Sequence, residues 1–214
     1  MDDIRILKLR HALPSDYSRV VAVIDDWWDG RAMSPRLSHV FFSHFAPTSF
    51  VIETETELAG FLLGFLSQTR VDEAYIHFVG VHPDFRRLGL GRRLYERFFA
   101  AARQYGRAWV SSITAPCNTT SIGFHRRLGF LMEKGNGIVD GVPARLDYAG
   151  EGGHRVVFHR RVTPDMWPGS PGLDLVREAA CSGEPRTIVP ARAERHVAPV
   201  RVAAVEVADL TDCA

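Results

Sequence analysis

The stretch Val81-His-Pro-Asp-Phe-Arg-Arg-Leu-Gly-Leu-Gly91 decides how the rest of the chain is interpreted. It follows an almost continuous apolar run, residues 74–81, and it leads into residues 90–105, where apolar side chains recur at helical spacing. Two glycines separated by one residue let the backbone turn tightly and approach a ligand without a Cβ in the way. The N–H groups of such a turn and of the helix that follows converge on one point, which suits an anion such as a phosphate. The stretch therefore predicts a strand, a phosphate-binding loop and a helix, in that order.

Three kinds of phosphate-binding loop contain such glycines, and residue spacing separates them. A Walker P-loop requires a lysine and a hydroxyl residue after its last glycine, and neither follows here. A dinucleotide-binding loop requires a third glycine, which would fall at Leu94. The pattern that remains is R-x-x-G-x-G, formed by Arg86, Gly89 and Gly91, with neighbouring arginines that add positive charge.

Two flanking motifs extend this pattern. The step Val81-His82-Pro83 precedes the loop, and Asn118-Thr-Thr-Ser-Ile-Gly-Phe-His-Arg-Arg-Leu-Gly-Phe130 follows it downstream. With both motifs in this order, the chain resembles the GNAT superfamily of N-acetyltransferases over roughly residues 4–162. His125 is a departure, because it stands where the family usually has a tyrosine.

The resemblance implies an α/β (α+β) fold of the GNAT type. Its central sheet is mixed and largely antiparallel, is flanked by helices, and is splayed between the strands that end near Val81 and Thr114. Hydrophobic patterns and turn residues predict the elements along the chain. We expect strands at 4–9, 50–55, 58–67, 74–81, 109–114, 130–133 and 155–162, helices at 15–28, 35–45, 90–105 and 118–128, and a glycine-rich loop at 135–153.

The resemblance also implies acetyl-CoA as co-substrate, with no metal ion. In the family, the strand before the loop offers its backbone to the pantetheine arm, the loop holds the pyrophosphate, and an asparagine bonds the arm. Carried onto this sequence, the expected cofactor-binding residues are Val79, Val81, Arg86, Arg87, Leu88, Gly89, Gly91, Arg92, Asn118 and Phe124. The cysteines are widely spaced and form no C-x-x-C pair, so they give no support for a zinc site.

Acetyl transfer to an amine requires a base, a group that polarises the thioester carbonyl, and a proton for the leaving thiolate. His77 is the first candidate for the base, because some family members carry a histidine here that acts through water, and imidazole titrates near neutrality. Period-two alternation places Tyr75, His77, Val79 and Val81 on one face of the strand. The alternative is a core histidine that is bonded to a backbone carbonyl.

Two further side chains are candidates for catalysis. His125 is the candidate general acid for the thiolate, and the alternative is that water supplies the proton while His125 only packs or bonds. Glu73 begins the same strand as His77 and could attract or deprotonate an ammonium, although such residues more often only solvate a strand end. A backbone N–H near Val79 is expected to polarise the thioester carbonyl.

These observations predict an acetyl-CoA-dependent N-acetyltransferase that moves the acetyl group directly to an amine. The tryptophans and carboxylates of residues 25–29 favour a small cationic amine as acceptor. Two other functions stay open, a non-catalytic acyl-CoA-binding module with a sensor or structural role, and a protein N-acetyltransferase. No motif reports the acyl chain length, and a homodimer is compatible with the resemblance because family members are often dimers.

The amino-acid composition indicates which kinds of partner are expected and where the domain ends. The 214-residue chain has 26 basic and 25 acidic residues, and this balance gives no support for a nucleic-acid partner. No run of about 18 apolar residues and no secretory apolar segment occurs, so we expect no membrane partner and a cytoplasmic location. From residue 163 the chain has six of the 12 prolines and no phenylalanine. We therefore expect a GNAT-like domain at 1–162 and a Pro-rich, loosely ordered tail at 163–214.

Overall fold

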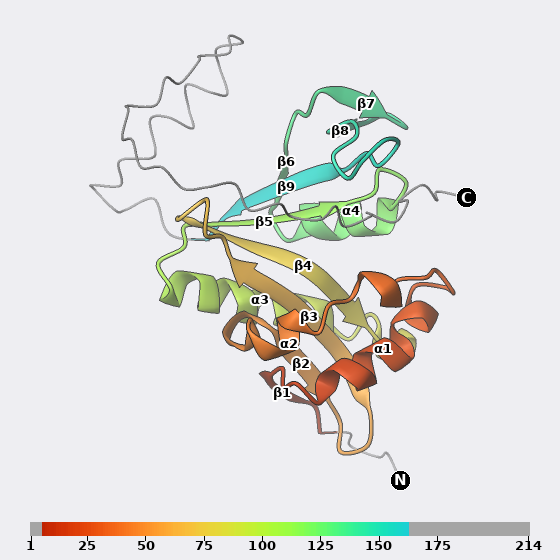
Figure 1. The fold of residues 1–214 in the computed structure, drawn as a ribbon, viewed down its shortest axis with the longest axis vertical. Helices are drawn as coiled ribbons and strands as arrows, with labels where there is room; N and C mark the ends of the chain where they lie inside the picture. The colour runs from red at the N-terminus through yellow and green to blue at the C-terminus, as the bar shows by residue number, and fades with distance from the viewer. Residues whose placement is uncertain (1–5, 163–214) are drawn as a thin grey trace, which may run out of the picture. The chain divides into compact units, whose positions relative to one another are not determined.

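The computed structural model describes residues 6–162 (Figure 1), so the predicted tail at 163–214 lies outside the described residues. The helices are α1 (Asp16–Trp27), η1 (Ser34–Arg36), α2 (Val40–Ser43), η2 (Ala46–Thr48), η3 (Pro83–Phe85), α3 (Leu90–Gln104) and α4 (Thr119–Arg127). The strands are β1 (Lys8–His11), β2 (Phe50–Glu53), β3 (Leu58–Leu66), β4 (Glu73–Val81), β5 (Trp109–Thr114), β6 (Leu131–Met132), β7 (Gly137–Val139), β8 (Val142–Ala144) and β9 (Val156–Arg161). Within residues 6–162, no helix is long and apolar enough to cross a membrane.

Seven strands form one mixed sheet in the order β1-β2-β3-β4-β5-β9-β6. Every neighbouring pair is antiparallel except β4 and β5, which run parallel because α3 carries the chain from one to the other. The predicted fold, a mixed and largely antiparallel sheet flanked by helices, is confirmed.

Three predicted elements were wrong in detail, the first of them the strand expected at 4–9, which is found at Lys8–His11. Residues 35–45 form η1 and α2 rather than one helix, because Leu37 between them is extended (φ −87°, ψ 115°) and buried. The glycine-rich loop contains the hairpin β7–β8, whose two-residue turn is Asp140-Gly141. Both turn residues have positive φ, 51° and 75°, as a type I′ hairpin turn requires.

Helices cover both faces of the sheet, and each face has its own apolar cluster. The amphipathic α3 buries Leu94, Tyr95 and Phe98 against one face. The helices α1 and α2 lie on the opposite face (Figure 1). Ile24 of α1 and Phe42 of α2 belong to the apolar cluster there. The sheet therefore has one α3 face and one α1/α2 face, and these two names are kept below.

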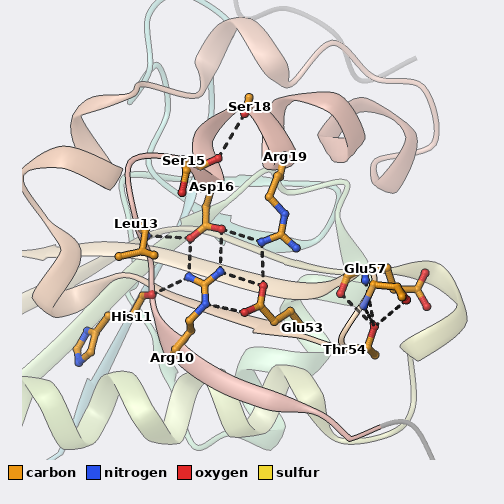
Figure 2. Close-up of polar contacts among 11 residues, drawn as sticks. Arg10, His11, Leu13, Ser15, Asp16, Ser18, Arg19, Glu53, Thr54 and Glu57 are labelled. Carbon is orange, nitrogen blue, oxygen red and sulfur yellow. Dashed lines mark hydrogen bonds and ion pairs between the residues drawn. The ribbon is translucent and has the colours of Figure 1, made fainter.

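A network of charged side chains ties β1 and β2 to the start of α1 (Figure 2). Arg10 donates to both carboxylate oxygens of Asp16, at 2.7 and 2.9 Å, and to both of Glu53, at 2.6 and 2.9 Å. Arg19 donates to the same two carboxylates, at 2.9 and 2.8 Å. Asp16, only 1% exposed, also accepts the backbone N–H of Leu13 at 2.8 Å. Because a buried carboxylate is costly unless it is paired, these bonds hold α1 in place on the sheet.

Candidate functional site

The candidate site is a cleft in the middle of the sheet, where two parallel strands separate. β4 and β5 pair from Glu73↔Trp109 as far as Ile76↔Ser112, but β4 continues to Val81 and β5 to Thr114. The predicted splay between these strands is confirmed. Residues of both strands line a cleft of about 1500 Å³ that opens beyond their last pair.

A β-bulge at His77 changes the direction of the side chains along β4. Leu63 pairs with Phe78 and Gly64 pairs with Ile76, so His77 is the extra residue. The predicted single face was wrong for this reason. Tyr75 and His77 contact aromatic rings of the α1/α2 face, whereas Val79 and Val81 pack against the α3 face. The bulge therefore puts the side chains of Tyr75 and His77 on one face of the sheet and those of Val79 and Val81 on the other.

Beyond the bulge, the backbone of β4 offers hydrogen-bonding groups to the cleft. The N–H of His82 bonds to Ala59 O on β3 at 3.0 Å. Since successive residues of a strand point their polar groups to alternate sides, Gly80 also faces β3, and Val79 and Val81 face the cleft. Their backbone groups lie where β5 has already diverged.

The loop between β4 and α3 has the conformation that its glycines predict. Gly89 is the N-cap of α3, with φ 79°, and Arg87 is also left-handed, with φ 65°. A Cβ on Gly91 would lie 3.1 Å from Phe124 Cζ, so glycine keeps α3 close to α4. Arg86 donates to the carbonyl of Trp27 at 2.7 Å and to that of Val81 at 3.3 Å, which fastens the loop to the end of α1.

Nine of the ten predicted cofactor-binding residues line this one cleft; Leu88, which is 62% exposed, does not. Asn118 caps α4 through its Oδ1, which accepts the Ser121 N–H at 3.0 Å. Its amide nitrogen is not used in this cap. The loop, the N-terminus of α3 and the cap of α4 thus converge on the same space.

His77 lies at the mouth of the cleft on the α1/α2 face. Its ring stacks on Phe41, with centroids 4.7 Å apart and planes 11° from parallel, and Phe78 meets it edge-on at 4.7 Å. The remainder of the side chain is exposed. Burial of the covered side disfavours the imidazolium and lowers the pKa of His77 below its ordinary value. The ring is therefore neutral at neutral pH and able to accept a proton.

His125 lines the cleft but is almost completely enclosed, with only 3% of its surface exposed. Its Nδ1 lies 2.8 Å from the carbonyl of Ser121, and its Nε2 lies 2.9 Å from the hydroxyl of Tyr95. Because a carbonyl only accepts, Nδ1 carries the proton and Nε2 accepts from Tyr95. The ring also stacks on Phe158 at 4.4 Å. Burial lowers the pKa of His125, although the bond to Ser121 raises it in part.

The structure does not bring Glu73 to this cleft. Its carboxylate accepts from Ser111 Oγ and from Arg70 Nη1, the latter at 3.2 Å, and it lines a separate, smaller pocket. Asp25 is likewise engaged, because its carboxylate accepts from the N–H groups of Met33 and Ser34 and from Ser34 Oγ at 2.7 to 2.8 Å. Neither carboxylate is available to an acceptor in the cleft.

Sequence reasoning missed several residues that line the cleft, and Tyr95, Arg36 and Arg155 are three of them. Tyr95 is fully buried and reads in the sequence as one more apolar residue of α3. Arg36 and Arg155 line the cleft from η1 and from the residue before β9. Nothing in their local sequence marks them, because their proximity depends on how distant segments fold. Among residues 6–162, no group of three or more His, Cys, Asp or Glu side chains could hold a metal ion.

Comparisons with known proteins agree with this geometry. A family model described as the acetyltransferase (GNAT) family matches residues 10–130. A solved acetyltransferase of the GNAT family from Desulfovibrio desulfuricans has a TM-score of 0.61 at 15% identity, over 74% of this chain and all of that one. A comparison with curated protein sequences found no match.

Two other solved structures differ in the acceptors that their descriptions name. Diaminobutyrate acetyltransferase from Paenibacillus lautus, in complex with L-2,4-diaminobutyric acid and coenzyme A, has a TM-score of 0.58 at 19% identity, over 76% of this chain and 99% of that one. Ribosomal-protein-S18-alanine N-acetyltransferase from Escherichia coli has a TM-score of 0.55 at 18% identity, over 77% and 99%. At these identities the likeness shows the fold alone.

Proposed function

The chain belongs to the acetyltransferase (GNAT) family, and from that premise we propose that it transfers an acetyl group directly from acetyl-CoA to the amine of a small molecule. One observation carries this proposal. The strand edge of Val79 and Val81, the left-handed turn at Gly89 and the N-terminus of α3 all face one cleft beside His77. This arrangement supports a cofactor-binding cleft next to a neutral imidazole.

The residues of the cleft suit the chemical parts of coenzyme A. The backbone groups of Val79 and Val81 suit the pantetheine amides, which pair with a strand edge as another strand would. The N–H groups around Gly89 and Gly91 suit the pyrophosphate, because they meet the positive end of the α3 dipole. Arg87, Arg92 and Arg127 also line the cleft and supply charge to the phosphates. Once bound, the thioester supplies the acetyl group.

His77 is the proposed base. A proton leaves the acceptor ammonium for His77, directly or through one water molecule, and the free amine then attacks the thioester carbon. The N–H of Val79 donates to the carbonyl oxygen as negative charge builds there. The C–S bond breaks, the acylated nitrogen releases its second proton to solvent to give the neutral amide, and the thiolate gains a proton.

The geometry supports water, rather than His125, as the source of the proton that the leaving thiolate gains. Both ring nitrogens of His125 are engaged, by Ser121 and by Tyr95, and its lowered pKa keeps the ring neutral. The thiolate of CoA is a weak base that solvent can protonate near neutral pH. His125 then holds α4 against Tyr95 and Phe158.

Replacing Gly89 with valine tests the assignment of the loop. A β-branched residue is strained at φ 79°, and its side chain would stand where the turn has to approach the pyrophosphate, so we expect the Kd for CoA to rise at least about tenfold. Gly106→Val is the matched control, because Gly106 has φ 71°, an added Cβ also meets no neighbour there, and it does not line the cleft. Calorimetric titration with CoA measures both. Equal CoA affinity in folded Gly89→Val and Gly106→Val would contradict the assignment.

A further inference from the structure

Of the seven arginines that line the cleft, Arg92 alone forms an ion pair with a carboxylate among the residues described, and Arg36 and Arg155 are two of the other six. Arg36 Nη1 lies 3.8 Å from Met33 Sδ, and Arg155 Nη1 donates to the carbonyl of His154 at 2.7 Å. In residues 6–162, no ion pair joins either guanidinium to a carboxylate. Burial lowers the pKa of Arg155, and the positive charge of Arg36 lowers it further. Two cations that line one cleft without a carboxylate partner, one of them half-buried, are stabilised when an anion binds there.

Their position points to the acceptor and not to the cofactor. Along β9, Val156 and Phe158 face α3, so Arg155 faces the opposite side of the sheet by strand alternation. There Arg155 lies within electrostatic reach of Tyr75, whose ring centroid lies 6.3 Å from that of His77. The side chains of Val79 and Val81, whose backbone is proposed to bind pantetheine, pack instead on the α3 face. The phosphates of CoA are therefore assigned to the loop, and Arg36 and Arg155, which line the same cleft as His77, are left for the acceptor.

The remaining charges of the cleft agree with an anionic acceptor group. Seven arginines line the cleft, against two aspartates, Asp29 and Asp140. Four of these arginines lie around the cofactor loop and on α4, namely Arg86, Arg87, Arg92 and Arg127. The carboxylate of Asp25, part of the segment that suggested a cationic acceptor, is bonded within its own loop. The part of the cleft left for the acceptor therefore contains arginines as well as aspartates.

We propose that Arg36 and Arg155 bind a carboxylate of the acceptor, so that the substrate is amino-acid-like, with a free amine at His77 and a carboxylate at the arginine pair. This inference rests on the proposed acetyltransferase function and names its substrate class. Guanidinium groups bind carboxylates through paired N–H donors, which would also fix the direction in which the amine points. An anion between the two arginines would relieve their mutual repulsion.

The test compares L-amino acids with their own primary amides, which keep the size and remove the charge. We expect wild-type kcat/KM to favour the acid by about ten- to a hundredfold, the range of a charged hydrogen-bonded contact. Arg36→Met and Arg155→Met keep the side-chain stem and should lose most of that preference, with the Kd for acetyl-CoA unchanged. Arg126→Met is the matched control, because Arg126 is exposed on α4 and does not line the cleft. Wild-type enzyme that uses amides as well as acids would overturn the inference, as would an unchanged preference in Arg155→Met.

A binding experiment separates this inference from the proposed function. N-acetyl-amino acids and their amides are titrated into the CoA-saturated full chain, with no turnover required. Selective binding of the acids that Arg155→Met abolishes supports the carboxylate site, even if no acetylation occurs. Equal or absent binding of acids and amides overturns it, even if other amines are acetylated. Failure of the proposed function has a different signature, which is the absence of acetyl-CoA binding and of thiol release with every amine.

Discussion

Replacing His77 with glutamine lowers kcat by about 100- to 10,000-fold, the range attributed to a positioned general base, and leaves the Kd for acetyl-CoA unchanged. The reason is the position of His77, which is exposed at the cleft while its ring is held on Phe41. Glutamine keeps a polar side chain there but cannot take a proton near neutral pH. Steady-state kinetics with thiol release as readout, together with calorimetric titration of acetyl-CoA, measure the two quantities separately.

The pH profile gives a second readout of the same residue. Because burial lowers the pKa of His77, the midpoint of the acid limb of the wild-type kcat/KM profile should lie below about pH 6.5, the ordinary value of an imidazole, and activity is lost as the ring is protonated. His77→Gln should lack this acid limb. His44→Ala is the matched control, since His44 is exposed and does not line the cleft. A fall in kcat of less than about threefold in His77→Gln would remove the residue from the mechanism.

Replacing Asp16 with asparagine lowers the free energy of unfolding by about 3 kcal/mol at pH 7, the lower end for breaking a buried ion pair. The lower end applies because Arg10 and Arg19 keep 22% and 38% of their side-chain surface exposed and Arg10 retains Glu53. For a domain of this size, that loss corresponds to a fall in Tm of roughly 6–12 °C. Urea unfolding followed by circular dichroism measures it. Glu96→Gln is the control, because its pair with Arg92 is exposed on both sides and worth at most about 1 kcal/mol.

The same network of charged side chains around Asp16 determines how the stability of the fold depends on pH. Burial alone would raise the pKa of Asp16, but hydrogen bonds from Arg10, from the Leu13 N–H and from Arg19 outweigh it and lower the pKa. Stabilisation from a lowered pKa is present above the unfolded value, about pH 3.9, and is lost as the pH falls through the folded value. Wild-type stability should therefore fall below about pH 4 more steeply than that of Asp16→Asn. Parallel curves for the two proteins would show that Asp16 is not charged in the fold.

The fold was predictable where local pattern and chain order agree. The apolar run of residues 74–81 and the glycines after it correspond to β4 and the N-terminus of α3, and Asn118 is the cap of α4. The type I′ turn at Asp140-Gly141 is one of the strongest hairpin signals in a sequence, but the surrounding glycines obscured it. The short strand β1 was placed too early, because its position is set by pairing with β2 and not by its own alternation.

The site was predictable only in part, and the bulge at His77 explains why. Nothing in the sequence of β4 distinguishes a regular strand from a bulged one, because the bulge depends on how β3 pairs with it. Arg155 is similar, since Arg36, which lines the same cleft, comes from an irregular segment between α1 and α2. Residues that act through motifs can be found in the sequence, whereas residues that meet through topology cannot.

The divergence of β4 from β5 gives the sheet an internal edge. Exposed edge strands invite pairing with other chains, and proteins normally cover or charge them. Here the edge of Val79 and Val81 lies between flanking strands of its own sheet, so another protein's strand has little room to approach. The amides of these residues should exchange with deuterium faster than those of the paired half of β4 in the free protein, and should become protected when a ligand completes the strand. The backbone groups of Val79 and Val81 thus remain free to form the hydrogen bonds of an edge strand, but only a narrow, strand-like small molecule has room to reach them.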